Sequence, residues 1–371
     1  MPHSMIGTKG ADDPAAHIWV VSDGTAGMRL QAVALAEALI RARPGWSFDD
    51  FIITPHPLIR ALPRAAAMLP GLPLYGAASV TAGGDRGALA RRPHPGHYPD
   101  ILITCGRRMA GYALALKRRA RVDGRVDGRA DGRVDGRIMQ IVHLQDPRLS
   151  PSLFDALLVP QHDRARGPNV LVTAGSLNRL TLAGIQAAMM EIPSRWLETT
   201  RRAAVAVMLG GDNRRYRVTP EMGDAMADRL AAFAHTSGAM LMIMTSRRTP
   251  DGLVERVCAK LPSDAVMLPG EGEPNVYPGI LGMAQAVIVS ADSVNMASEA
   301  AITGKPVMIA PWQTATAANP SGESGRIRAF HNHMFAAGHT VPLAGTIPHG
   351  PFKRLDEMAA VTDELLRLLE R

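Results

Sequence analysis

The residues best suited to chemistry follow three apolar segments in the second half of the chain. Gly-Gly-Asp-Asn comes after 202–209, Ser-Arg-Arg after 239–245, and Asp-Ser soon after 286–289. Adjacent glycines allow a ligand to approach the backbone closely, and paired arginines are charge-assisted donors to phosphate oxygens. We therefore predict a diphosphate site, and its candidate residues are Gly210, Gly211, Asp212, Asn213, Ser246, Arg247, Arg248, Asp292 and Ser293.

The segment Ala286–Pro306 adds a carboxylate to this site. Its sequence predicts a strand, a polar turn and then a helix whose N-terminus favours an anion. Glu299 follows about two turns into that helix, on a face of small residues, where it would accept hydroxyls of a ribose whose phosphates lie at the helix start. An ordinary capped βα turn with a solvated glutamate has the same spacing, so that alternative stays open.

The first half of the chain opens with a strand, a glycine-containing loop and a helix. His17–Ser22 is the predicted strand, and the helix is expected from about residue 28 to 42. The loop between them has a weaker pattern than a dinucleotide fingerprint, because it lacks the third glycine. It still offers phosphate- or acceptor-binding candidates, namely Gly24, Thr25 and Gly27.

Three residues near strand ends in this half are candidates for a catalytic base. Asp23 is the first candidate, and Asp146 and His162 follow two later predicted strands. The alternative for each residue is a structural role as a loop cap, and the sequence does not identify which of the three is the base. His143 lies within its strand and is predicted to be a buried core residue.

Strands and helices alternate twice along the chain, with a Pro-containing charged linker at 192–201. This predicts an α/β protein of two doubly wound Rossmann-like domains that face a cleft. We expect an acceptor-side domain at 1–195 and a donor-side domain at 196–371, with the last helix returning to the N-terminal domain.

The net charge of +7 suggests a nucleic-acid partner, but its distribution opposes one. Residues 107–137 contain ten basic and four acidic residues, a net of +6, and Tyr112 is their one aromatic residue, too few for a surface that stacks on bases. This segment includes four tandem RVDG-type repeats at 121–136, which we interpret as a low-complexity surface loop inserted in the first domain.

The remaining composition predicts a cytoplasmic protein. The two cysteines are far apart, the N-terminus lacks an apolar signal core, and no stretch is long enough to span a bilayer. Leu58–Gly76 is apolar with scattered arginines. It is expected to pack on its own domain; the alternative is peripheral contact with the inner face of an anionic membrane.

Several motifs together resemble a known family. They are VSDGTAGMRLQAVALAEAL, HLQDPR, PQHD, LGGDNRRYR, MTSRRTP and VSADSVNMASEAAITGKPV, from Val20 to about Pro311. They resemble bacterial proteins grouped with the plant "elongated mitochondria" mitochondrial-fission protein, whose bacterial members are also labelled predicted nucleoside-diphosphate-sugar epimerases. The resemblance implies a GT-B glycosyltransferase-like fold and, for Glu299, the ribose-binding role of the helix glutamate in GT-B donor sites. The RVDG repeat is not part of the family pattern.

These observations favour a metal-independent GT-B-like glycosyltransferase that uses a nucleotide-diphosphate sugar as substrate and needs no cofactor. Leu58–Gly76 suggests a lipid-linked or cell-envelope acceptor. The alternatives are a nucleotide-sugar epimerase on the same fold and a non-catalytic nucleotide-binding scaffold.

Overall fold

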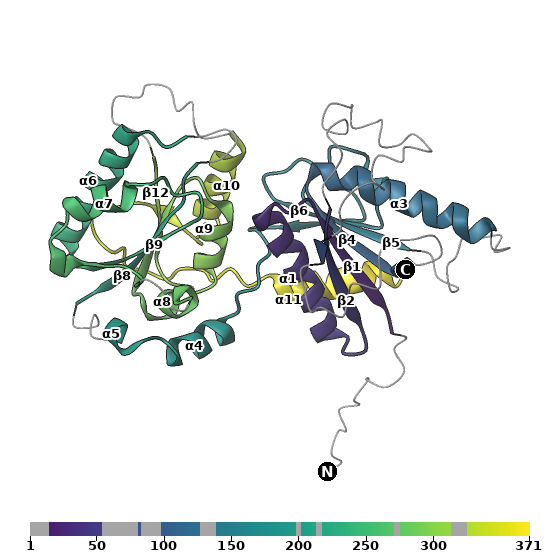
Figure 1. The fold of residues 1–371 in the computed structure, drawn as a ribbon, viewed down its shortest axis with the longest axis horizontal. Helices are drawn as coiled ribbons and strands as arrows, with labels where there is room; N and C mark the ends of the chain where they lie inside the picture. The colour runs from purple at the N-terminus through teal and green to yellow at the C-terminus, as the bar shows by residue number, and fades with distance from the viewer. Residues whose placement is uncertain are drawn as a thin grey trace, which may run out of the picture. The chain divides into compact units, whose positions relative to one another are not determined.

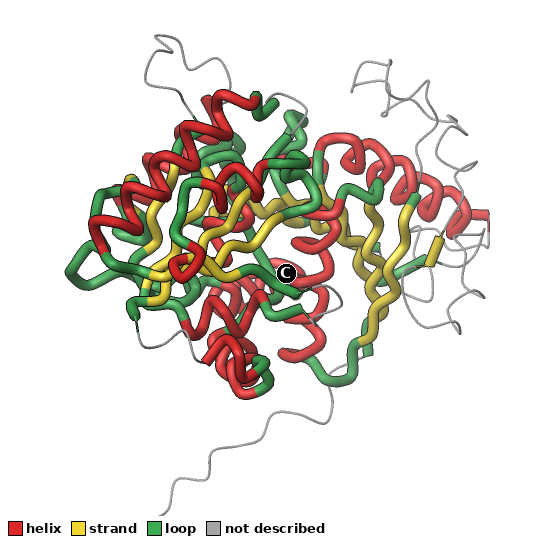
Figure 2. Tube along the Cα trace, turned by 60° about the vertical axis from the view of Figure 1, so that its left-hand side comes forward, coloured by secondary structure: helices red, strands yellow, loops and turns green. Residues whose placement is uncertain are grey.

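The computed structural model of the chain describes residues 15–53, 81–82, 98–126, 139–197, 202–212, 217–270, 275–312 and 325–371. Asn213, Leu58–Gly76 and residues 127–136 lie outside these ranges. The chain forms two compact α/β units. Unit 1 comprises 1–159, 163–173 and 358–371, and unit 2 comprises 160–162 and 174–357. Figure 1 shows their elements, and Figure 2 shows the strands of each unit between helices.

Unit 1 is built on a seven-stranded sheet of order β3-β2-β1-β4-β5-β6-β7. The strands are β1 (His17–Ser22), β2 (Ser47–Ile52), β3 (Thr81–Ala82), β4 (Ile101–Cys105), β5 (Gln140–Leu144), β6 (Ala156–Pro160) and β7 (Val170–Thr173). Strands β2, β1, β4, β5 and β6 pair in parallel, whereas β3 runs antiparallel beside β2. The central strands are buried on both faces, which explains their continuous apolar sequences.

Three long helices cover this sheet: α1 (Ala26–Ala42), α3 (Arg107–Val126) and α11 (Met358–Leu369). Trp19 and Val21 of β1 pack in one cluster with Met109 and Ala113 of α3. The chain therefore returns to unit 1 in its final helix, which packs beside α1 and contacts β7 (Figure 1).

Unit 2 is built on a six-stranded parallel sheet of order β10-β9-β8-β11-β12-β13. The strands are β8 (Ala204–Leu209), β9 (Met240–Thr245), β10 (Val266–Met267), β11 (Ala286–Ser290), β12 (Val307–Ala310) and β13 (Val341–Pro342). The α-helices of this unit are α4 (Leu182–Met190), α5 (Ser194–Leu197), α6 (Pro220–Ser237), α7 (Leu253–Ala259), α8 (Tyr277–Met283), α9 (Val294–Ala301) and α10 (Gly325–Ala336).

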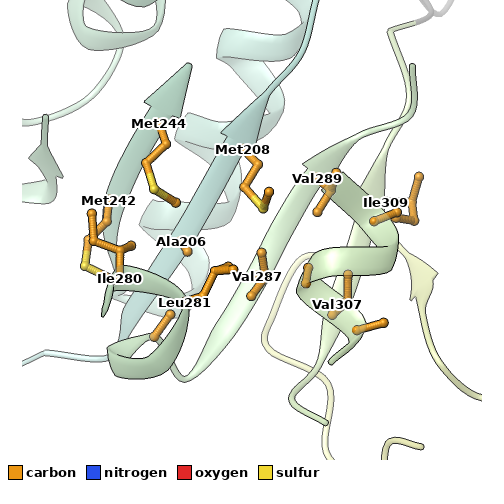
Figure 3. Packing of buried hydrophobic residues seen from close by; sticks show 14 of the residues in the cluster. Ala206, Met208, Met242, Met244, Ile280, Leu281, Val287, Val289, Val307 and Ile309 are labelled. Atoms are coloured by element: carbon orange, nitrogen blue, oxygen red, sulfur yellow. The ribbon is translucent and has the colours of Figure 1, made fainter. Parts of the chain in front are cut away.

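Alternate residues of the unit 2 strands pack into two cores, one on each face of the sheet. Ala206 and Met208 belong to the cluster that contains residues of α8, α9 and α10. Figure 3 shows Met242 and Met244 of β9, Met208 of β8, and Val287 and Val289 of β11 on three successive strands in this cluster. Val205 and Val207 pack instead with residues of α6 and α7. The two doubly wound α/β units confirm the predicted fold class.

The structure divides the chain earlier than residue 195. Residues 174–195 belong to unit 2 because α4 packs on α8. A Cβ on Gly279 would lie 2.8 Å from the Ala188 carbonyl oxygen, and one on Gly282 would lie 2.3 Å from Met189 Sδ. The two glycines of α8 thus admit α4 at close range, a contact that the local sequence at 182–190 does not reveal.

The two ends of the segment 174–357 are tied together within unit 2. The Glu357 carboxylate accepts hydrogen bonds from the backbone N–H groups of Ala174 at 2.7 Å and Gly175 at 3.0 Å. The Ser176 N–H donates to Ser298 Oγ of α9 at 2.9 Å. The chain therefore enters and leaves unit 2 at the same place.

The interpretation of the entire RVDG repeat as a loop is wrong, because α3 continues through its first six residues. Arg119 and Asp123 form an ion pair with i,i+4 spacing at 3.9 Å, and the Tyr98 hydroxyl donates to the Asp123 carboxylate. These contacts stabilise the helix despite the glycine at 124, which costs about 1 kcal/mol relative to alanine. Within the described ranges, no helix is both long and apolar enough to cross a membrane.

Candidate functional site

Three loops meet at the carboxyl edge of the unit 2 sheet. They follow β9, β8 and β11, which are neighbours in the sheet and run parallel. These loops carry Ser246 to Arg248, Gly210 to Asp212, and Asp292 with Ser293, respectively. The structure thus brings together the described members of the predicted diphosphate site.

The buried carboxylate of Asp292 links these loops. Its Oδ2 accepts a hydrogen bond from the Gly211 N–H at 3.0 Å and pairs with Arg248 Nη2 at 3.0 Å. Its Oδ1 accepts from Ser290 Oγ at 2.7 Å and from the Trp312 indole N–H at 2.9 Å. Because both oxygens are engaged by protein groups, Asp292 holds the loops in place and leaves anion binding to its neighbours.

Gly210 and Gly211 must be glycine because groups of the neighbouring loops lie where a Cβ atom would be. A Cβ on Gly210 would lie 2.2 Å from Asp292 Oδ2, and one on Gly211 would lie 1.9 Å from the Arg248 carbonyl oxygen. The Gly210 N–H donates to Ser290 Oγ at 2.7 Å, and the Asp212 N–H donates to the Arg248 carbonyl at 2.9 Å. The Gly-Gly sequence predicted that a ligand would approach the backbone closely. In the structure, the groups that approach these glycines belong to the protein itself, namely Asp292 and Arg248.

The loop after β9 holds its own shape and presents Arg247. Ser246 Oγ accepts from the Arg248 N–H at 3.2 Å, and the Thr249 hydroxyl donates to the Leu209 carbonyl at 2.8 Å. Arg247 is exposed, and no carboxylate of the described residues pairs with it. Its guanidinium is thus available to an anionic ligand.

Ser293 begins helix α9 and Glu299 lies in its second turn. Ser293 Oγ accepts the Met296 N–H at 3.3 Å, so this hydroxyl serves as the N-cap. Glu299 is half-buried, and its Oε2 accepts a hydrogen bond from the Tyr277 hydroxyl at 2.5 Å. Burial raises the pKa of the Glu299 carboxyl, while the hydrogen bond from Tyr277 lowers it.

Three residues that support this edge escaped the sequence interpretation: Tyr277, Trp312 and His331. Trp312 bonds Asp292, and the buried His331 contacts the Ala291 carbonyl through Nε2 at 2.8 Å. Burial is the main cause of the lowered pKa of His331, so the ring is neutral at pH 7 and donates from Nε2. No local motif marks these residues, because each acts on the edge from a different element.

The carboxyl edge of the unit 1 sheet carries Asp23 and the glycine loop. Asp23 Oδ1 accepts the Thr25 N–H at 3.1 Å, and Oδ2 lies 3.5 Å from Arg108 Nη1 at the start of α3. Gly24 has a φ of 76°, which favours glycine. The Gly27 carbonyl accepts from the Gln31 side chain at 3.1 Å.

Asp146 follows β5 in a turn with unusual backbone geometry. Gln145 and Arg148 both have positive φ, at 71° and 57°, although neither is glycine. Asp146 Oδ1 accepts the Arg148 N–H at 2.7 Å, and its own N–H donates to Asp163 Oδ2 at 3.2 Å. Two strained residues in one four-residue turn are typical of a functional loop.

The two histidines of the sequence prediction have different surroundings. His143 is fully buried in β5, bonds Thr104 Oγ1 through Nδ1 at 2.7 Å, and has a pKa lowered to about 3 by burial. It is therefore a neutral core residue, as predicted. His162 belongs to unit 2, where its ring packs edge-on against Phe330 at 5.7 Å.

A family model described as mitochondrial fission ELM1 matches residues 26–369. The chain belongs to this family. The match includes both units and all the candidate site residues except Asp23, Gly24 and Thr25. Among the described residues, no group of three or more His, Cys, Asp or Glu side chains is arranged to hold a metal ion.

Two relatives of the ELM1-family chain illustrate its range. It is 27% identical over 275 residues to the mitochondrial fission protein ELM1 of Arabidopsis thaliana, covering 65% of this chain and 60% of the plant protein. It is 25% identical over 247 residues to an uncharacterized protein of Rickettsia prowazekii, covering 57% of this chain and 64% of the relative. The chain thus spans less than two thirds of the length of either relative.

Among solved structures, the chain is similar to a UDP-GlcNAc 2-epimerase from Neisseria meningitidis bound to UDP-GlcNAc. The identity is 13%, the alignment covers 95% of this chain and 92% of the epimerase chain, and the TM-score is 0.45. It is also similar to MurG from Acinetobacter baumannii, with 13% identity, 96% and 92% coverage and a TM-score of 0.45. Both TM-scores lie below 0.5, so neither likeness assigns an activity to this chain.

Proposed function

We propose that this ELM1-family chain is a GT-B-like glycosyltransferase that binds a nucleoside-diphosphate sugar at the carboxyl edge of the unit 2 sheet. The observation that carries the proposal is the joining of three polar loops through Asp292, with Arg247 exposed beside them. An edge that is already ordered can meet a diphosphate with little loss of conformational entropy.

The diphosphate would be bound by Arg247 and by the amino-terminal end of α9. The guanidinium supplies charged donors, and the helix terminus adds a partial positive charge that favours an anion. When the bond from the sugar C1 to the diphosphate breaks, negative charge accumulates on the leaving diphosphate. The same groups would stabilise that charge more strongly than the substrate charge.

Glu299 would accept hydroxyl groups of the ribose. Its carboxylate is half-buried, where a hydrogen bond to a charged acceptor is worth more than one at the surface. The side chain lies two turns into α9, so a nucleotide with its phosphates at the helix start would extend toward it.

Asp23 is our proposed base for the acceptor. Its carboxylate would take the proton of the acceptor hydroxyl while the acceptor oxygen attacks the sugar C1 and the diphosphate leaves with the bonding electrons. Asp146 and His162 are the alternative bases. Asp23→Asn is expected to lower turnover by about 100-fold or more while leaving affinity for the sugar nucleotide unchanged.

Calorimetric titration with UDP-, GDP-, ADP- and CMP-sugars tests the donor site. We expect binding to at least one sugar nucleotide, with losses of about tenfold or more in both Arg247→Ala and Glu299→Ala. Arg256→Ala and Glu255→Ala are matched controls, because both residues are exposed on α7. Absence of binding, or binding that Glu299→Ala leaves unchanged, would contradict the proposal.

Time-resolved NMR of a bound sugar nucleotide then separates the chemistries. Transfer to an added acceptor or slow hydrolysis supports a transferase, whereas inversion at a ring carbon with the diphosphate bond intact identifies an epimerase. Binding without any turnover would identify a non-catalytic scaffold.

We further propose that the acceptor is linked to a lipid or to the cell envelope, on the basis of the apolar, arginine-containing sequence Leu58–Gly76. Flotation with anionic liposomes tests this point. The full chain is expected to float and a Leu58–Gly76 deletion to stay behind. Equal behaviour of the two proteins would contradict membrane contact through this segment.

A further inference from the structure

The tyrosine at the start of α8 contacts the carboxylate proposed to bind the ribose. The Tyr277 hydroxyl donates to Glu299 Oε2 at 2.5 Å, and both side chains are half-buried. The structure assigns no donor from the described residues to the other oxygen, Oε1, and that oxygen is not among the buried atoms that lack a partner. One oxygen of the carboxylate is thus engaged by the protein and the other is available.

Helix α8 is held firmly enough to fix the tyrosine. Ile280 and Leu281 are fully buried in the core on this face of the sheet. At the other end of the helix, the Lys305 ammonium donates to the carbonyl oxygens of Leu281, at 3.1 Å, and of Gly282. The close packing of α4 on α8 restrains the helix from the outer side.

We propose that Tyr277 is a positioning residue for Glu299: it occupies one lone-pair site of Oε2, and Glu299 binds the ribose chiefly through one hydroxyl, at Oε1. This proposal rests on the proposed nucleotide-sugar function. A carboxylate oxygen can accept two hydrogen bonds, as both oxygens of Asp292 do. On Glu299, a ribose hydroxyl at Oε2 would share that oxygen with the phenol, whereas Oε1 is unshared and is the stronger acceptor. The site would therefore distinguish the two ribose hydroxyls from each other.

The hydrogen bond between Tyr277 and Glu299 also affects the pKa values of the two side chains. Burial, followed by the charge of Glu299, raises the pKa of Tyr277 well above its usual range, so the phenol remains a donor at any physiological pH. The Tyr277 hydrogen bond lowers the pKa of Glu299 against the raising effect of burial. Loss of the hydroxyl therefore favours the protonated form of Glu299, which is a poorer acceptor.

The first test measures the titration of Glu299 in the full chain without ligand. Carbon-13 NMR of labelled glutamate carboxyls is recorded across pH for the wild type and for Tyr277→Phe, with the Glu299 signal assigned from Glu299→Gln. The pKa of Glu299 is expected to rise in Tyr277→Phe. Tyr98→Phe is a matched control, since the Tyr98 hydroxyl also donates to a carboxylate, that of Asp123 in unit 1. An unchanged Glu299 titration in Tyr277→Phe overturns the positioning role.

The second test compares UDP, GDP and ADP with their 2′-deoxy and 3′-deoxy analogues by calorimetry. In the wild type, one deoxy analogue is expected to lose about tenfold in affinity and the other no more than about twofold. In Tyr277→Phe, affinity for the parent nucleotide should fall about fivefold, both hydroxyls should matter, and binding should be lost at a higher pH than in the wild type.

Equal losses for the two deoxy analogues in the wild type would overturn the single-hydroxyl assignment. If none of UDP, GDP and ADP binds, the proposed nucleoside-diphosphate site fails and the ribose assignment fails with it. The ligand-free titration still decides whether Tyr277 sets the state of Glu299, so the two failures are distinguishable.

Discussion

In unit 2, one buried carboxylate accepts hydrogen bonds or an ion pair from groups that follow three different strands, whereas the carboxylates at the edge of unit 1 bond mainly within their own loops. Asp292 engages Gly211 after β8, Arg248 after β9 and the Trp312 indole after β12. Asp23 bonds the N–H of Thr25, two residues away. Asp146 likewise bonds the N–H of Arg148.

This difference suggests a division of labour between the two edges. A carboxylate whose oxygens are all occupied can hold loops together, and it prepares donors such as Arg247 for a bound anion. A carboxylate with only a local partner and a more distant arginine, as Asp23 has in Arg108 at 3.5 Å, retains capacity to accept a proton. We therefore expect unit 2 to respond to mutation chiefly in stability and affinity, and unit 1 chiefly in turnover.

Removal of the linking carboxylate should have the largest effect on stability. Asp292→Ala leaves buried donors on Gly211, Ser290 and Trp312 without their acceptor and is expected to cost about 3–5 kcal/mol of unfolding free energy. Asp23→Ala removes one local backbone hydrogen bond and an ion pair at 3.5 Å, and is expected to cost less, about 1–2 kcal/mol. Denaturant unfolding followed by tryptophan fluorescence measures both, and equal costs would remove the contrast between the edges.

Substitution of a glycine should likewise destabilise the protein more at the unit 2 edge than at the unit 1 edge. Gly211→Ala places a Cβ 1.9 Å from a backbone oxygen of another loop, so the loops must separate, at about 2–3 kcal/mol. The Cβ of Gly24→Ala would contact only the Ile52 side chain, at 3.2 Å. Its cost in unfolding free energy, about 1 kcal/mol, arises mainly from the φ of 76° at this position. Thermal unfolding of the two variants checks the order, and a costlier Gly24→Ala would reverse our account of why Gly211 is glycine.

Ligand affinity should separate the arginines of the two edges. Arg247→Ala is expected to weaken sugar-nucleotide binding about tenfold and to reduce its dependence on salt, because an exposed cation is lost. Arg108→Ala should leave donor affinity within about twofold while it lowers turnover through Asp23. Titrations at two salt concentrations, combined with a turnover assay, distinguish these effects, and a donor defect in Arg108→Ala would contradict the division of labour.

The smallest expected effect concerns Glu299. Burial raises its pKa above the value in the unfolded chain, so the folded protein gains stability as the pH falls from above the raised pKa to the ordinary value. Glu299→Gln should remove this dependence and raise the stability of the folded protein at pH 7, at the expense of ligand affinity. Thermal unfolding between pH 7 and pH 4 checks the sign, and a destabilised variant would show that the ionised carboxylate has a structural role.

The fold and the convergence of the three loops were predictable from local patterns. Apolar strands followed by short polar loops and helices predict parallel α/β units, and parallel strands bring their carboxyl ends to one edge. The roles within the edge were not predictable in the same way. The sequence does not reveal that the carboxylate oxygens of Asp292 bind Trp312 and Arg248, because these partners come from separate elements.

The domain boundary shows the same limit. The charged, proline-containing stretch at 192–201 has the composition of a linker, yet Trp196 within it is fully buried in the unit 2 core. Likewise, α3 runs into a glycine-rich repeat because Tyr98 and Arg119 contact Asp123. Local composition therefore does not determine whether a segment is a linker, a loop or a helix, because tertiary contacts can override it.

The hydrogen bonds of Glu357 to Ala174 and Gly175 bear on the order in which the protein is made. Unit 2 is complete once residue 357 has been synthesised, whereas unit 1 still lacks α11, which packs beside α1. Unit 1 is therefore the first to leave the ribosome and the last that can finish folding. A truncation that removes 358–371 would expose α1 and leave the proposed donor site in unit 2 intact. Such a truncation would therefore destabilise unit 1 before unit 2.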